Sequence, residues 1–195
     1  MSHHRLLHAL ALVILLQLGV PAVHAQPTAG PPGSDLTVEQ RRAYNEGLAQ
    51  ARKLMADKQW AKAGERLDAL VKERPREAQG RFLKGVVQTE VGNKDAAIAT
   101  FRALIDDYPE IPEPYNNLAV LFAERGDIEA ARTALETEIR TAPEWATAHE
   151  NLGDVYTRMA AEQYDRAATL DRSNRSAATK LRLARDLLAS ASSRP

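Results

Sequence analysis

The chain repeats itself every 34 residues, and this period constrains its fold more than any other feature of the sequence. Five sets of residues recur at the same interval. They are Pro75, Pro109 and Pro143; Ala63, Ala97 and Ala131; Leu67, Phe101 and Leu135; Gly85, Ala119 and Gly153; and Gly92 and Gly126. Composition alone does not produce five series at one period. A fixed period of this length indicates a repeat protein, in which each unit buries its apolar face against its neighbours.

The residue types within one period predict two helices joined by a tight turn. Gly92 and Gly126 are placed to end the first helix of their units, where a left-handed backbone conformation is needed. The prolines are placed between units, because a helix must stop there and its successor must start. The small-residue series that contain Gly85 and Ala97 are expected where the two helices cross, since larger side chains would push them apart. Leu67, Phe101 and Leu135 should fill the layer between the helices.

The period and the residue types resemble the tetratricopeptide repeat, whose outline is W-x2-L-G-x2-Y, then A-x3-F, then P. One unit reads Tyr115-Asn-Asn-Leu118-Ala119-Val-Leu-Phe122, and the next reads His149-Glu-Asn-Leu152-Gly153-Asp-Val-Tyr156. The resemblance covers about residues 44–172. It implies an all-α fold, a right-handed α-solenoid of helix pairs, with about three repeats, a degenerate fourth repeat and a capping helix.

The repeats are unequal in quality. Residues 78–111 and 112–145 match well, whereas residues 44–77 match less well because Gln50 and Ala51 replace the Leu-Gly pair and Lys58 replaces the turn glycine. The fourth unit lacks the turn, so the stretch from Ala146 to Asp171 predicts one long helix. Its inner side is expected to carry Leu152, Val155, Tyr156, Met159, Tyr164 and Ala167.

A last helix is predicted from Ser173 to Ser190. Its apolar positions can cover the end of the stack while its arginines stay in water, as terminal capping units do. These apolar positions are Leu181, Ala184, Leu187 and Leu188. The repeat domain is therefore expected at 37–172 and the capping helix and tail at 173–195.

The N-terminus has the pattern of a secretory signal peptide. Arg5 precedes a largely apolar run, and Val23-His24-Ala25 fits the site that a signal peptidase reads, so residues 1–25 are expected to be removed. An uncleaved membrane anchor is the alternative, although the run is short for a full span. Residues 26–36 are rich in proline, glycine and small polar residues and predict a flexible linker. Thr37 and Gln40 resemble a capping box that opens the first helix.

Composition excludes several classes of function. Lys+Arg and Asp+Glu both number 26, which gives no support for nucleic acid or for an anionic membrane as partner. The chain has no cysteine, and His149 is the only histidine after residue 25. No zinc site, phosphate loop or catalytic motif follows from these residues, so no cofactor and no enzyme activity are predicted. His149 itself is expected to be a packed, partly buried ring.

The resemblance implies that the first helix of each unit lines a concave groove that binds a polypeptide. The candidate groove residues are Phe82, Val86, Asn116, Asn117, Val120, Glu150, Asn151, Asp154 and Arg158. Asn117 and Asn151 lie one period apart, and their amides can donate to and accept from a peptide backbone. The same amides can instead bond to a neighbouring helix, and Phe82 can be ordinary core. Family members that hold acidic chaperone tails use lysines here, and this chain has none at those places.

The sequence therefore predicts a non-catalytic scaffold for protein–protein interaction, an adaptor or co-chaperone of the bacterial cell envelope. Its partner is expected to be a protein or peptide, and its location the periplasm or the exterior. Two alternatives stay open: a self-assembling structural module, and an accessory subunit of an envelope enzyme complex.

Overall fold

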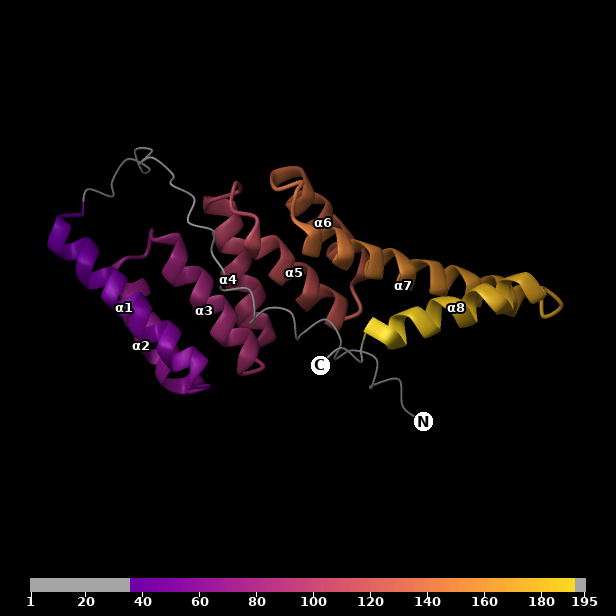
Figure 1. Cartoon of the computed structure of the whole chain (residues 1–195), viewed down its shortest axis with the longest axis horizontal. Coiled ribbons are helices and arrows are strands. Elements are labelled where there is room, and N and C mark those ends of the chain that lie inside the picture. Colours follow the sequence, from indigo (N-terminus) through magenta and orange to yellow (C-terminus); the bar gives the residue numbers. More distant parts are fainter. Residues whose placement is uncertain (1–35, 192–195) are drawn as a thin grey trace. The chain divides into compact units, whose positions relative to one another are not determined.

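The computed structural model describes residues 36–191, and every secondary-structure element in this range is an α-helix. The predicted signal peptide and residues 26–35 of the predicted linker lie outside the described residues. The helices are α1 Val38–Ala56, α2 Trp60–Glu73, α3 Ala78–Glu90, α4 Lys94–Asp107, α5 Glu113–Glu124, α6 Ile128–Thr141, α7 Ala146–Leu170 and α8 Arg175–Ala191 (Figure 1).

The helices form two compact units, with α1–α4 before Pro109 and α5–α8 after it. Within the first unit α1 packs on α2, α2 on α3 and α3 on α4. The second unit follows the same order from α5 to α8. Within each unit every helix therefore packs against its neighbours in sequence, which is the contact pattern of a repeat protein.

The start of α1 confirms the predicted capping box. Thr37 Oγ1 accepts a hydrogen bond from the backbone N–H of Gln40 at 3.2 Å, and Gln40 Oε1 accepts one from the backbone N–H of Thr37 at 3.0 Å. Two of the unpaired donors at this helix end are thereby satisfied.

The periodic small and large residues form the core of both units. Ala63, Ala97, Ala131, Leu67, Phe101 and Leu135 are all buried. A Cβ added to Gly85 would lie 2.5 Å from Phe101 Cε1, closer than any side chain tolerates. The crossing of α3 and α4 thus depends on the absence of a side chain at Gly85, as the sequence predicts.

The turns inside the repeats keep the 34-residue register. Gly92 and Gly126 have φ of +79° and +83°, which confirms the predicted left-handed helix ends. Lys58, at the same place in the first repeat, also has a positive φ of 54°. Asn93 and Asp127 then cap the second helices by accepting backbone N–H groups. The first repeat is therefore more regular than its sequence suggests.

A buried tyrosine ties the first repeat to the second. The backbone N–H of Gly80 on α3 donates to the Tyr44 hydroxyl on α1 at 3.0 Å. A Cβ on Gly80 would come within 2.9 Å of that oxygen, so glycine is needed for this approach. Burial is the main reason why the pKa of Tyr44 lies above its usual value.

The fourth repeat is one long helix, as predicted, but two of its residues are placed differently from expectation. Helix α7 runs for 25 residues without a turn, and α8 folds back beside it (Figure 1). Gly153 has no atom within 4 Å of an added Cβ, because no second helix crosses at that level. Tyr156 was expected on the inner side but is 47% exposed.

Helix α8 begins at Arg175, two residues later than predicted, because Asn174 caps it by accepting the backbone N–H of Ala177 at 2.9 Å. Ala177, Leu181 and Ala184 form its buried side. Leu187 was expected among them but is 55% exposed. The contact with α7 is therefore centred nearer the start of α8 than the sequence suggested.

Candidate functional site

Helices α5 and α7 are the first helices of the last two repeats, and they carry the polar residues of the second unit's candidate site. Residues spaced by three or four positions share one side of a helix. We call this surface the α5–α7 face. It consists of Glu113, Asn116 and Glu124 on α5, and of Glu150, Asp154 and Arg158 on α7. Val120, a predicted groove residue on the same side of α5, is instead 3% exposed and belongs to the core.

One hydrogen bond joins the two helices at this face. Asn151 Nδ2 donates to Asn116 Oδ1 at 2.7 Å. Asn117 Nδ2 instead donates to the carbonyl oxygen of Glu113 on its own helix, at 2.8 Å. Asn117 and Asn151 are 5% and 9% exposed. Both amide N–H groups thus serve as ties within the fold, whereas Asn117 Oδ1 is buried and has no hydrogen-bond partner among the described residues.

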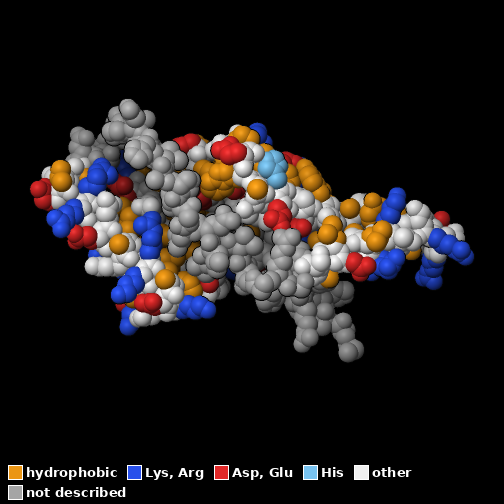
Figure 2. All heavy atoms as spheres, viewed as in Figure 1, with side chains coloured by type: hydrophobic (Ala, Val, Ile, Leu, Met, Phe, Trp, Pro, Cys, Tyr) orange, Lys and Arg blue, Asp and Glu red, His pale blue; other side chains and the backbone are white. Residues whose placement is uncertain are grey.

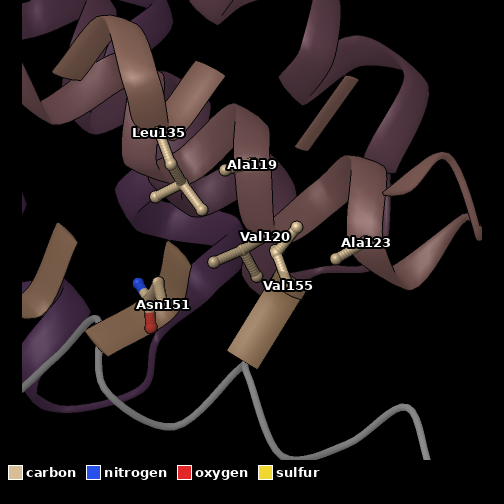
Figure 3. A pocket seen from close by; sticks show the side chains of 6 residues that line it. All are labelled: Ala119, Val120, Ala123, Leu135, Asn151 and Val155. Carbon is tan, nitrogen blue, oxygen red and sulfur yellow. The ribbon is translucent and has the colours of Figure 1, made fainter. Parts of the chain in front are cut away.

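A small cavity lies behind the face, between α5, α6 and α7. Ala119, Val120 and Ala123 of α5, Leu135 of α6, and Asn151 and Val155 of α7 line it (Figure 3). Its volume of about 10 Å³ is close to the least that can hold one water molecule. The cavity is too small for a ligand and is not itself a binding site.

The two remaining predicted groove residues lie on α3, in the first unit. Val86 is 5% exposed and belongs to the core. Phe82 is half-buried, and its ring centroid lies 5.9 Å from that of Phe101. Both residues therefore pack inside the first unit. The structure brings together only the predicted residues on α5 and α7.

Glu138 is a site that sequence reasoning missed. It is 1% exposed on α6, and its Oε2 has no hydrogen-bond partner among the described residues. Burial, and secondarily the negative charge of Glu113, raise the pKa of Glu138 to about 8. Leu104 and Leu70 occupy the equivalent places one and two periods earlier. A carboxyl in a series of buried leucines is the signal that could have revealed it.

A cluster of charged side chains ties α6 to α7. Arg132 Nη1 donates to Glu136 Oε1 at 2.7 Å, and the Tyr156 hydroxyl donates to the same oxygen at 3.1 Å. Arg132 also pairs with Glu129 at 3.1 Å. The hydrogen bond from Arg132 is the main cause of the lowered pKa of Glu136. This cluster explains why Tyr156 stays at the surface.

His149 is exposed, although a partly buried ring was expected. Its Nε2 lies 2.9 Å from the carbonyl oxygen of Pro143, which it reaches as a hydrogen-bond donor. Between residues 36 and 191 no three histidine or acidic side chains gather in a way that could hold a metal ion. In the same part of the chain no helix is both long and apolar enough to cross a bilayer.

Comparison with known proteins agrees with this geometry. The family model described as tetratricopeptide repeat matches residues 48–112 and 116–178. No curated protein matches the chain significantly.

Solved structures share the fold at low sequence identity. The type III secretion chaperone SycD of Yersinia enterocolitica, in complex with a peptide of the translocator YopD, is 12% identical with a TM-score of 0.57, covering 63% of this chain and 99% of SycD. MamA of Desulfovibrio magneticus, from residue 41 onward, is 16% identical with a TM-score of 0.53. The match covers 78% of this chain and 80% of the MamA chain.

A thermophilic repeat protein of Thermus thermophilus is 18% identical with a TM-score of 0.55, covering 72% of this chain and 80% of that one. These likenesses, together with the all-helical structure of the described residues, confirm the predicted all-α solenoid class. The family model matches well over half of the sequence. The chain belongs to the tetratricopeptide repeat family.

Proposed function

We propose that this protein is a non-catalytic adaptor or co-chaperone of the bacterial cell envelope that holds a polypeptide on its α5–α7 face. Proteins of this repeat family generally act as scaffolds for protein–protein interaction, and the SycD structure contains a bound peptide. The observation that carries the proposal is the hydrogen bond from Asn151 to Asn116. It holds two first helices in register, so that their polar side chains are organised before a partner arrives.

The face offers the groups that a polypeptide backbone needs. Asn116 is half-buried and Glu150 is exposed, and they lie on neighbouring helices joined by that hydrogen bond. An amide can pair with backbone N–H and C=O groups of any sequence. Binding through such groups tolerates several partner sequences, which suits an adaptor.

The location in the cell envelope is part of the proposal and rests on the sequence. The run before Ala25 has the order of a signal peptide, so the mature protein is expected to begin at Gln26. Intact-mass measurement of the exported protein tests this. A mass that includes residues 1–25 would show that the segment is retained as an anchor.

A self-assembling module is the second candidate, and an exposed apolar pair on α8 favours it. Leu183 and Leu187 are 56% and 55% exposed and lie four residues apart on one side of the helix. Sedimentation over a range of concentrations separates the candidates. An adaptor stays monomeric until it meets its partner. A module that assembles through α8 instead shows an apparent molecular mass that rises with protein concentration. In the double variant Leu183→Ser with Leu187→Ser this rise should disappear.

Site-specific crosslinking in the cell envelope tests the adaptor directly. A photoreactive residue placed at Asn116 or Glu150 is expected to capture a polypeptide that can be identified by mass spectrometry. The matched control carries the same residue at Glu129 on α6, whose side chain is also exposed. Capture at Glu129 and none at the two positions of the face would exclude the α5–α7 face as the binding surface.

A further inference from the structure

Charge is distributed unevenly along this chain, although its sum is zero. Residues 110–157, which span α5, α6 and the first half of α7, hold ten acidic and three basic side chains, a formal charge of −7. Residues 36–109 hold eleven acidic and fourteen basic side chains. Helix α5 and the first twelve residues of α7 contain no lysine or arginine at all. The acidic excess thus coincides with the helices that carry the α5–α7 face.

The face itself is acidic. It carries Glu113 and Glu124 from α5 and Glu150 and Asp154 from α7, against a single base, Arg158. Burial lowers the pKa of Arg158, and the nearby charge of Asp154 opposes that change. Fixed charges of one sign on one surface create a potential that selects a partner of the opposite sign.

Buried acceptors without donors lie at the same end of α5. Asn117 Oδ1 and Glu138 Oε2 are buried and have no hydrogen-bond partner among the described residues. Both are linked to Glu113: Asn117 donates to its carbonyl oxygen, and its carboxylate raises the pKa of Glu138. Glu138 is protonated near neutral pH, so the unpaired acceptor that remains beside Glu113 is Asn117 Oδ1. A lysine ammonium brings three donors and an arginine guanidinium five, each with a positive charge that complements the carboxylates of the face.

We infer that the segment held on the α5–α7 face is basic, with lysine or arginine side chains directed to Glu113, Glu150 and Asp154. The inference rests on the proposed function and adds the chemistry of the partner. The same acidic side chains repel acidic segments, so the face discriminates against acidic partners as well as favouring basic ones. Specificity on this face comes from charge, while the amide of Asn116 binds the backbone.

The chain also contains a basic helix of its own, which the experiment must separate from a foreign partner. Helix α8 has four bases and one acid, and basic side chains are visible toward the turn between α7 and α8 (Figure 2). If the α8 of a second copy occupied the face, the protein would associate with itself. Self-association that is lost on neutralising Glu150 and Asp154 would assign the face to a second copy and overturn the inference.

Fluorescence anisotropy of the mature chain, residues 26–195, with two labelled peptides supplies the test. One peptide alternates lysine and serine, and the other alternates glutamate and serine. We expect the lysine peptide to bind and the glutamate peptide not to bind. Raising the ionic strength from about 0.1 M to 1 M, which shortens the Debye length from about 10 Å to 3 Å, should weaken the binding of the lysine peptide.

Matched variants then locate the binding. Glu150→Gln with Asp154→Asn removes two charges from the face, and Glu144→Gln with Glu162→Gln removes two exposed charges elsewhere in the same unit. The face variant should weaken binding of the lysine peptide about three- to thirtyfold, and the control variant less than about twofold. Equal losses in both variants, or no binding of the lysine peptide, would overturn the inference. Crosslinking that still captures a polypeptide at Asn116 would then show that the adaptor role stands and only the charge preference fails.

Discussion

Glu138 makes the stability of this protein depend on pH. Its pKa is about 8 in the folded state because of burial and of Glu113, against 4.5 for an ordinary glutamate. Below about pH 4.5 the carboxyl is protonated in both states. Between about pH 4.5 and 8 the folded protein keeps a proton that the unfolded chain has released, so the free energy of unfolding falls as the pH rises.

Glu138→Leu should remove that dependence and stabilise the protein. Leucine occupies the equivalent buried place at Leu70 and Leu104, and replacing a buried carboxyl whose pKa is raised with an apolar side chain of similar volume gains about 1–4 kcal/mol near neutral pH. Thermal melts of both proteins between about pH 5 and 9 measure this. The gain should grow with pH, and the reciprocal change Leu104→Glu should introduce a similar slope. Parallel curves for wild type and Glu138→Leu would contradict the assignment.

Lys58 is strained by the turn that it occupies. Its φ of 54° lies where Gly92 and Gly126 stand in the later repeats, and a side chain in that region costs about 1–2 kcal/mol. Lys58→Gly relieves the strain but adds freedom to the unfolded chain. We expect a net stabilisation of about 0.5–1 kcal/mol in urea unfolding. Lys62→Gly inside α2 is the control and should lose about 1 kcal/mol. A loss in both variants would show that Lys58 is not strained.

Gly85 and Gly153 belong to the same small-residue series, but only Gly85 lies where a side chain would clash with a neighbouring helix. Gly85→Ala places a Cβ 2.5 Å from Phe101 and should separate α3 from α4, at a cost of about 1–3 kcal/mol. Gly153→Ala meets nothing within 4 Å, and alanine in an exposed helix position should gain about 0.5–1 kcal/mol. Opposite shifts of the melting temperature are expected. Equal losses would mean that a helix crosses α7 at Gly153 after all.

Sequence periodicity predicted most of the helical elements, because the same physical demand recurs at the same place. Helix crossings need small residues such as Ala97, turns need positive φ at Gly92, and loops between repeats tolerate Pro109. The long α7 followed from the absence of a turn signal. The first repeat was expected to match less well because Lys58 replaces the turn glycine. The turn nevertheless forms, because the repeat imposes a positive φ on a lysine that does not prefer it.

Orientation and burial in the last repeat could not be predicted in the same way. Tyr156 was assigned to the inner side of the long helix and Leu187 to the cover at the end of the stack, but both are about half exposed. Tyr156 hydrogen-bonds to Glu136 at the surface, and the buried side of α8 consists of Ala177, Leu181 and Ala184. Nor could spacing alone tell which partner each asparagine would take. The bonds of Asn117 and Asn151 depend on which neighbouring carbonyl or amide comes within about 3 Å.

The chain as a whole combines a repeat scaffold with one acidic, amide-bearing surface. The stacked helix pairs supply stability within each unit, and the α5–α7 face supplies the exposed chemistry. The hydrogen bond between Asn151 and Asn116 contributes to both stability and binding, because it joins α5 to α7 and positions the polar side chains of the face. Removing it should cost about 0.5–1.5 kcal/mol of stability, a modest change for a domain of this size.

The most direct test of this account is the affinity of the crosslinked partner for the double variant Asn116→Ala with Asn151→Ala, measured by titration calorimetry below the melting temperature. The protein should remain folded, with its melting temperature lowered by a few degrees. Its dissociation constant should rise about ten- to a hundredfold, because the amide that meets the partner and the tie that positions it are both lost. An unchanged dissociation constant in the folded double variant would contradict the claim that the partner binds on the α5–α7 face.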